Sequence, residues 1–299
     1  MTVVLENDLF YNFDRHYTNG LMLAWIPKRT TTPDWILKLA DKIPWNAERY
    51  TICHGYVIGQ NMYTPLDITL SDPPLDDRPY AGWSYVGVGL LIERDNHLGQ
   101  LTLSVGWVGP SSKADRAQID LHELIGSKKP MGWEHQIADE PGFVLAYQHT
   151  WRQFASTLLS GNELDLMPHA GLSLGNVYTY VNTGLTVRYG NVLQRDYGPL
   201  RIQPSPPGGG VIGLQSGVRW YLFSGVDVRV VGRNIFLDGN TFKNSRSVEK
   251  KPIVADWQNG IVVSYKDMRF SYTHVYRSRE YDGADDWEDF GAVSFSWIY

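Results

Sequence analysis

Apolar and polar residues alternate with a period of two along most of the chain, which is the pattern of strands with one buried face. Segments 100–108, 225–233, 267–277 and 289–299 show it most clearly. Strands of soluble sandwiches commonly span about 5–6 residues, whereas a strand that crosses a bilayer at a tilt needs about 9–11. The alternating segments reach that length, so the pattern favours a membrane-spanning β-barrel over a soluble all-β protein.

The same pattern predicts an all-β, antiparallel transmembrane barrel of about twelve strands. The stretch 212–238 contains Ser224-Gly225 and would give thirteen strands if it were split there. Single-chain bacterial barrels have even strand numbers, so we predict one strand over it. The predicted strands are 2–10, 16–27, 51–63, 80–94, 98–108, 141–155, 163–175, 177–190, 212–238, 253–266, 267–279 and 289–299.

With both chain ends on the periplasmic side, every second connection lies on the outer side. The predicted outer loops are 11–15, 64–79, 109–140, 175–177, 239–252 and 280–288. The longest contains a helical pattern over 114–125, with three apolar residues on one side: Ala117, Leu121 and Leu124. Ser112, with an acidic residue three positions later, resembles a capping box, and Gly126 is a helix stop. A second short amphipathic helix is predicted within the inner segment 28–50.

Composition agrees with a barrel in one domain over residues 1–299. Aromatic residues make up 13% of the chain, and 29 glycines suit many tight turns. The net charge is −5 and no basic run is present, so nucleic-acid binding is not expected. The single cysteine, Cys53, excludes a disulfide framework and a multi-cysteine metal site.

The ends of the chain carry two expectations. No signal peptide precedes the first strand-like segment, so we expect a mature form with an added start Met1. Bacterial outer-membrane barrels typically end on an aromatic residue in the last strand, as Tyr299 does here. The longest apolar stretch, 86–92, is too short for a transmembrane helix.

Four short motifs fall at the predicted outer ends of strands or in outer loops. They are Glu6-Asn7-Asp8, Tyr17–Gly20, Asp77–Trp83, and the loop helix that carries Gln118 and His122. Gln118 and His122 are four residues apart and share one helix face. Because strand ends and loops meet at the barrel mouth, we expect these motifs to converge on one site.

The alternation also makes predictions about orientation. Thr18 has the parity of Gly20 and Met22 and is predicted to face inward. Asn7 and Asp8 have opposite parity, so a regular strand would turn only one of them toward a common ligand unless a bulge intervenes. Each residue also has an ordinary explanation: a surface histidine, a turn aspartate, or an internal ion pair for the arginine of the Asp77–Trp83 motif.

Five motifs occur in a fixed order between Glu6 and Pro141. They are END-L-F, D-x-x-YTNG, DRPYAGW, GP followed by Q-x-x-x-H-x-x-x-G, and GW-x-x-Q-x-x-x-EP. This ordered set resembles the outer-membrane lipid A 3′-O-deacylase family. The resemblance covers about the first half of the chain, and the second half matches only in its barrel pattern.

The resemblance implies an integral protein of the bacterial outer membrane with an outward-facing active site. It implies hydrolysis of the ester-linked 3′ acyl group of lipid A in the outer leaflet, with Ca²⁺ as the cofactor and a monomer as the state. By motif match, the active-site residues are Asn7, Asp8, Thr18 and His122. Asp8 and Asn7 are the implied metal ligands.

One position departs from the family pattern. Lys128, followed by Lys129, stands six residues after the histidine, where the family can have a glutamate. A cation cannot ligate Ca²⁺, so other oxygens are needed there, and Glu123, Glu134 and Glu140 are the candidate substitutes.

The expected chemistry follows from these residues. His122 acts as general base on a water, Ca²⁺ stabilises the oxyanion, and Asn7 or Thr18 donates a further hydrogen bond. Lipid A carries phosphates, so the expected substrate contacts are cationic or polar side chains of the outer loops: Arg78, Gln118, Lys128 and Lys129.

Two other functions stay open at this stage. One is an outer-membrane phospholipase or serine esterase that uses Ser111 or Ser112, although no nucleophile elbow is present. The other is a channel or structural barrel whose lumen is lined by Arg188, Arg229 and Arg269.

Overall fold

The computed structural model describes residues 1–7, 16–27, 33, 51–158, 161–191, 193, 197–198, 217–284 and 287–297, and for 16–18 and 154 the backbone alone. Within these ranges, the chain forms thirteen strand segments. They are β1 (Thr2–Asn7), β2 (His16–Trp25), β3 (Thr51–Thr64), β4 (Ala81–Arg94), β5 (His97–Val108), β6 (Glu140–Trp151), β7 (Gln153–Thr157), β8 (Glu163–Gly175), β9 (Tyr178–Gly190), β10 (Val218–Asn234), β11 (Ile253–Tyr265), β12 (Met268–Ser278) and β13 (Trp287–Trp297). The described helices are η3 (Pro110–Ser112), α2 (Ala114–Ile125), η4 (Trp133–His135) and α3 (Ile235–Asp238).

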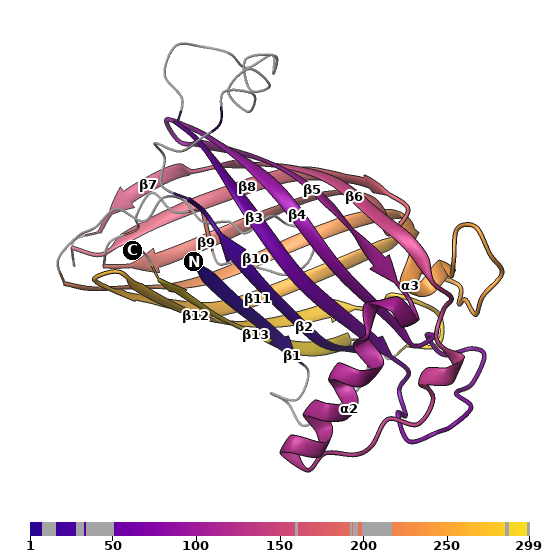
Figure 1. The fold of residues 1–299 in the computed structure, drawn as a ribbon. Helices are drawn as coiled ribbons and strands as arrows, with labels where there is room; N and C mark the ends of the chain where they lie inside the picture. The colour runs from indigo at the N-terminus through magenta and orange to yellow at the C-terminus, as the bar shows by residue number, and fades with distance from the viewer. Residues whose placement is uncertain are drawn as a thin grey trace.

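The strands close into a twelve-stranded antiparallel barrel (Figure 1). β6 and β7 both pair with β8 and lie end to end, so they form one strand of the wall that is interrupted at Arg152. β1 pairs with β13, and the β6–β8 pairing completes the ring. Closure matters because neighbouring strands then satisfy each other's backbone groups around the ring, which a sheet with free edges cannot achieve in lipid.

The predicted strands are confirmed within the described residues, except that 235–238, predicted as the end of a strand, form the short helix α3. The strand ends there because the Asn234 side chain caps the helix, accepting from the N–H of Phe236. β10 runs without a break through Ser224-Gly225, so one strand occupies that stretch and the even count holds. The predicted helix within 28–50 lies outside the described residues. None of the described helices is long and apolar enough to cross a bilayer.

Side chains sort to the two faces of the wall as the alternation predicts. Large apolar residues at outward positions are exposed, among them Leu21, Ile58, Val86, Leu103 and Phe270. Inward positions are buried and often polar, among them Arg188, Arg229, Asp256 and Arg269. An apolar outside around a polar inside is the arrangement of a barrel in a membrane.

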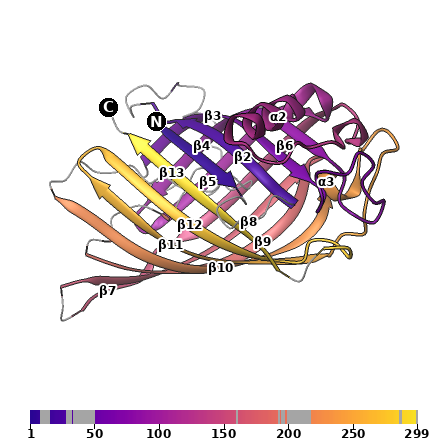
Figure 2. The same cartoon turned by 90° about the horizontal axis from the view of Figure 1, so that it is seen from below.

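The two ends of the barrel differ in the length of their connections. The N and C termini lie at the same end, where the backbone N–H of Trp297 donates to the carbonyl of Met1 at 2.8 Å. Two tight turns close hairpins at that end, with Asp95 and Lys266 in the left-handed region at φ 49° and 51°. The helix α2 and the long connections lie at the opposite end (Figures 1 and 2), which is the predicted outer end.

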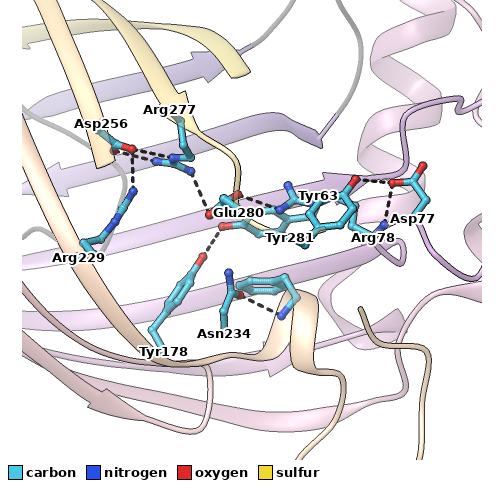
Figure 3. Close-up of polar contacts among 11 residues, drawn as sticks. Tyr63, Asp77, Arg78, Tyr178, Arg229, Asn234, Asp256, Arg277, Glu280 and Tyr281 are labelled. Atoms are coloured by element: carbon cyan, nitrogen blue, oxygen red, sulfur yellow. Dashed lines mark hydrogen bonds and ion pairs between the residues drawn. The ribbon is translucent and has the colours of Figure 1, made fainter. Parts of the chain in front are cut away.

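Paired charges fill the outer end of the lumen (Figure 3). The guanidinium of Arg277 donates to both carboxylate oxygens of Asp256 at 2.9 and 3.1 Å, and Arg229 donates to the same carboxylate at 2.8 Å. Arg78, which is fully buried, donates to Glu280 at 2.8 Å. We call these five side chains the lumen network. Each of its charges faces an opposite charge, as buried ions require.

The lumen network reaches into two outer connections. Burial alone would lower the pKa of Arg78, but the negative charges of Glu280 and Glu288 outweigh it and raise that pKa. Burial would raise the pKa of Glu280, but the positive charges of Arg277 and Arg78 outweigh it and lower that pKa. Next to this pair, the hydroxyl of Tyr281 donates to Asp77 at 2.5 Å. The connection after β3 is therefore tied to the connection after β12.

Candidate active site

The helix α2 forms over the predicted range 114–125, but the residue that caps its N-terminus differs from the prediction. Lys113 is the N-cap residue, in the left-handed conformation at φ 59°, and its own side chain makes no capping bond, while the N–H of Ala114 donates to Oγ of Ser112 at 3.4 Å. Ser112 belongs to η3, and its hydroxyl donates to the carbonyl of Gly109 at 2.6 Å, so the predicted capping box is wrong. The predicted stop is confirmed: Gly126, at φ 70°, donates its N–H to the carbonyl of His122.

The face of α2 that packs against the barrel carries Gln118 and His122 together, as their spacing predicts. Ala114, Gln118 and His122 are its buried residues, whereas Leu124 is 83% exposed and Ile125 is 51% exposed. The apolar side is divided, because Ala117 packs on the buried cluster around Trp133 whereas Leu124 is turned outward. The reason is the surroundings: a helix that rests on the outside of a barrel wall turns polar groups to the protein and leaves apolar groups at the membrane interface.

A glycine lets α2 sit directly on the wall. Gly82 of β4 occupies an outward-facing position, and a Cβ atom built there would lie 2.3 Å from the Cβ of Ala114 and 2.3 Å from the Oγ of Ser112. Any larger residue would force the helix away. This explains the glycine of the DRPYAGW motif by close packing.

A buried row continues from this contact across the outside of the wall. In register across four strands lie Asn7, Asn19, Met62 and Gly82. All four are buried, and Asn7 is 6% exposed. Residues two or four positions further along the same outward faces are exposed: Leu5, Leu21, Ile58 and Val86. Met62 and Gly82 are covered by α2 and the segment that follows it, and the two asparagines continue the row. A polar, shielded patch thus interrupts the lipid-facing surface.

His122 is buried on the face of α2 that points to this wall. It is 2% exposed, and its Nδ1 lies 2.5 Å from the main-chain carbonyl oxygen of Lys128. A carbonyl only accepts, so the imidazole carries a proton on Nδ1, and the neutral form of the ring then has its lone pair on Nε2. The chain folds back after Gly126, which brings the main chain of Lys128 to the ring.

Gln118 lies one helical turn before His122 and is held by a residue that sequence reasoning missed. The indole Nε1 of Trp133 donates to its Oε1 at 2.7 Å. Trp133 packs in turn against Tyr80, with ring centroids 4.8 Å apart, in a buried cluster with Met62 and Ala114. The GW-x-x-Q motif was the available signal, but nothing in its spacing indicated a contact with the helix.

The connection after β3 supports the segment after α2. The backbone N–H of Met131 donates to the carbonyl of Ile68 at 2.8 Å, and the hydroxyl of Tyr80 donates to the same carbonyl at 3.1 Å. The N–H of Ile137 donates to the carbonyl of Tyr80 at 3.0 Å. The DRPYAGW motif therefore links the lumen network, through Arg78 and its neighbours, to the wall-side site.

The remaining predicted residues occupy different places. Arg78 belongs to the lumen network, while the side chains of Lys128 and Lys129 are exposed in the outer connection after α2. Asp8 lies outside the described residues. The hydroxyls of Ser111 and Ser112 donate to Asp139 and to the carbonyl of Gly109.

The inward orientation of Thr18 stays a prediction, and the strand that carries it is irregular at this point. The pairing of β2 with β3 steps by three residues on β2, from His16 to Asn19, and by two on β3. This bulge adds one residue at positions 17–18 and breaks the alternation there. The backbone of Thr18 belongs to β2, and its side chain lies outside the described residues.

The donor chemistry near the site fits a hard cation. Ca²⁺ takes carboxylate, amide and carbonyl oxygens, and Asn7 brings a buried amide to the wall-side row. Of the proposed glutamate substitutes, Glu140 is occupied elsewhere, because its carboxylate accepts from Asn176 and from the backbone of Thr241. In the described part of the chain, no three His, Cys, Asp or Glu residues gather into a metal-binding group.

Comparison with known proteins matches both the sequence and the fold. The model of a family described as outer membrane protein LpxR matches residues 1–299. The solved structure of LpxR from Salmonella typhimurium has a TM-score of 0.81 at 19% sequence identity, covering 100% of this chain and 99% of that chain. The β-domain of the Bordetella autotransporter BrkA reaches a TM-score of 0.48 at 10% identity, with 100% and 96% covered, and carries no argument. No curated protein sequence matches the chain.

Proposed function

The chain belongs to the family of outer membrane protein LpxR and is an integral outer-membrane protein; from this premise, and from the ordered motifs between Glu6 and Pro141, we propose that it is a lipid A 3′-O-deacylase. It hydrolyses the ester that links the 3′ acyl group to the sugar, and it does so from the outer side of the membrane. We propose lipid A as the substrate because the ordered motifs resemble those of the lipid A deacylase family.

One observation carries the choice of site: His122 is buried between α2 and the outer surface of the barrel wall, with Nδ1 held by the carbonyl of Lys128 at 2.5 Å. A histidine with a fixed Nδ1 proton presents Nε2 as a base in one orientation. Asn7 extends the same buried surface, two strands from Met62 or about 10 Å away. The rise of an α-helix places His122 about 12 Å from Ala114, so the helix has the length to span this row.

The mechanism uses His122 first as a base and then as an acid. Nε2 removes a proton from a water as the water oxygen attacks the ester carbonyl carbon, which forms a tetrahedral oxyanion. The intermediate collapses with cleavage of the bond between that carbon and the sugar oxygen. The imidazolium returns the proton to the sugar oxygen, so the products are a free 3′ hydroxyl and a fatty acid. Asn7 and Thr18 are the proposed hydrogen-bond donors to the oxyanion.

A calcium ion is part of the proposal. Asp8 and Asn7 would hold it, and when bound it supplies positive charge to the developing oxyanion. The side chain of Lys128 is exposed rather than directed to the site, so its charge does not oppose a cation at the wall. The experiment that tests this role must change the calcium concentration while the protein stays unchanged.

The surroundings of α2 suit a lipid substrate. Leu124 and Ile125 are exposed on the outside of the helix, beside a wall whose outward residues are apolar. Acyl chains therefore meet apolar surface, and the ester reaches the polar row beneath the helix. Lys128 and Lys129 are the proposed contacts for the lipid A phosphates. Arg78, predicted as a further contact, is enclosed in the lumen network, and we propose a structural role for it.

The decisive experiment follows lipid A by mass spectrometry after incubation with the folded protein in detergent micelles. Parallel samples contain Ca²⁺, contain EDTA, or carry His122→Ala. The matched control is His135→Ala, which changes a partly exposed histidine of η4 that faces Asp72. Loss of the 3′ acyl group with Ca²⁺ and with His135→Ala, but not with EDTA or His122→Ala, supports the proposal.

Other outcomes point elsewhere. Cleavage in the presence of EDTA would support the hydrolase assignment but contradict the proposed role of calcium. Covalent labelling by a serine-reactive inhibitor would favour a serine esterase that uses Ser111 or Ser112. Intact lipid in every sample with a folded barrel would contradict the deacylase assignment.

A further inference from the structure

Trp133 sets the orientation of the Gln118 side chain. The indole Nε1 lies 2.7 Å from Oε1 of Gln118, and an indole N–H is a donor only. The atom that it meets must therefore be the amide oxygen. Of the two orientations that differ by a half-turn of the amide, this contact selects one.

The selected orientation leaves the amide nitrogen as a buried donor. Gln118 is 1% exposed, and no acceptor for its Nε2 is found among the residues that the structure describes. Buried amide N–H groups nearly always have partners in native proteins, because a missing bond is unfavourable. A donor that is shielded from water, held in one orientation and still able to bond an acceptor is suited to bind a ligand.

The position of this donor places it in the candidate site. Gln118 and His122 are one turn apart on the buried face of α2, so their side chains neighbour each other. This face is the one that rests on Gly82 and Met62.

We infer that Nε2 of Gln118 donates a hydrogen bond to an ester oxygen of the bound acylated sugar lipid, and that Trp133 is a positioning residue that keeps this donor in place. The inference rests on the proposed deacylase function and deepens it. With the amide reversed, its oxygen would face the ester oxygen, and two acceptors repel each other. The bond from Trp133 prevents that arrangement.

Trp133 is itself held rigidly enough for this task. Its ring lies against the fully buried Tyr80, whose hydroxyl donates to the carbonyl of Ile68. The preceding residue, Gly132, approaches so closely that a Cβ there would lie 2.7 Å from the Tyr80 ring. A positioning residue must have less freedom than the group it orients, and this packing provides it.

The experiment is a double-mutant cycle on lipid A hydrolysis in mixed micelles, with kcat and KM measured separately. Gln118→Met keeps the length of the side chain and removes the donor. Trp133→Phe keeps a ring against Tyr80 and removes only the N–H. The matched control is Trp257→Phe, which removes an indole N–H that donates to Ser224 at 3.1 Å on the exposed side of another strand pair.

We expect Gln118→Met to lower kcat/KM on the order of 10- to 100-fold, as the loss of one oriented donor does. Trp133→Phe lowers it about twofold in the wild-type background, because the amide then divides between two orientations and only one is productive. In the Gln118→Met background, Trp133→Phe has no further effect. Trp257→Phe leaves kcat/KM at the wild-type value.

Two results would overturn the inference. An equal loss from Trp133→Phe in both backgrounds would show that Trp133 acts only through folding. Wild-type kcat/KM in Gln118→Met would show that no donor was lost.

A binding measurement separates this inference from the proposed function. In the His122→Ala background, we expect Gln118→Met to weaken the binding of intact lipid A by about fivefold or more. If the wild type fails to hydrolyse lipid A but this weakening is found, the proposed deacylase function is wrong and the proposed hydrogen bond from Gln118 is retained. If hydrolysis occurs and Gln118→Met changes neither binding nor turnover, the inference fails alone.

Discussion

The two buried polar regions of the outer end differ in how their polarity is balanced. The lumen network consists of full charges, and each guanidinium faces a carboxylate, as Arg78 faces Glu280 (Figure 3). The wall-side patch under α2 consists of neutral amides and an imidazole, and Nε2 of Gln118 meets no acceptor within the described part of the chain. The lumen network also has donors without a hydrogen-bond partner among the described residues, Nε and Nη1 of Arg78 and Nη1 of Arg277, but these belong to guanidiniums whose charge a carboxylate balances. Balanced charges stabilise one structure, whereas a neutral donor beside His122 is suited to bind a ligand. The comparison teaches that burial of polar residues alone does not mark an active site.

The two regions are joined by one short motif. Asp77 and Arg78 contact the connection after β12, and Tyr80, two residues later, packs on Trp133. Changes in the lumen network should therefore affect stability first and activity only through this motif. Changes at the wall should affect activity with little effect on stability.

The largest expected effect is at the wall. His122→Ala should lower the deacylation rate about 10³-fold or more, because general-base catalysis by a positioned histidine contributes about 10²–10⁴-fold. The barrel should keep its unfolding midpoint, because α2 contributes none of the strand pairing. A comparable loss of stability in urea unfolding would contradict the separation of the two regions.

The next effect is in the lumen. Arg78→Ala should lower the free energy of unfolding by about 3–5 kcal/mol, because it leaves Glu280 buried without its nearest partner. The double variant Arg78→Met, Glu280→Gln should recover most of this loss, since neutral groups need no counter-charge. Urea unfolding in micelles measures both. A double variant as unstable as the single one would show that the ion pair is not the cause.

A smaller effect is expected where α2 rests on the wall. Gly82→Ala places a Cβ 2.3 Å from Ala114 and should displace the helix, lowering kcat/KM about tenfold while stability changes by less than about 1 kcal/mol. Gly89→Ala in the same strand is the control, because its Cβ would meet its nearest neighbour at 3.5 Å. Equal activity of the two variants would contradict the close seating of α2.

The smallest effect is a pH dependence. The pKa of Glu280 is lowered, since the positive charges of Arg277 and Arg78 outweigh its burial. A depressed pKa contributes stability that is fully present above the unfolded value of about 4.5 and is lost as pH falls below it. The stability difference between wild type and Glu280→Gln should therefore shrink from pH 5 toward lower pH. A difference that stays constant over this range would refute the prediction.

Much of the fold can be predicted from the sequence because each strand alternates between residues that face lipid and residues that face the lumen. Alternation located the strands, and the outward leucines and valines are exposed as predicted. Alternation does not survive an inserted residue, however, and the bulge between His16 and Asn19 means that parity alone no longer supports the predicted orientation of Thr18, which stays a prediction. The sequence pattern of one strand does not show where that strand has one residue more than its partner.

The site was harder to predict than the wall. The spacing of Gln118 and His122 put both on one helix face, but the apolar side with Ala117, Leu121 and Leu124 did not show which face would contact the protein. Leu124 is the most exposed of them, because a membrane surface offers apolar groups a second favourable place. The contribution of Trp133 depends on two loops meeting, which no short-range spacing records.

The placement of α2 on the outside of the wall determines how its substrate arrives. A lipid reaches such a site by lateral diffusion within its own leaflet, so the encounter takes place in two dimensions. The quantity that sets the rate is then the mole fraction of lipid A in the surface rather than its concentration in the medium. Dilution with an inert detergent should slow the reaction at constant bulk lipid, and the density of neighbouring lipids becomes a control on the enzyme.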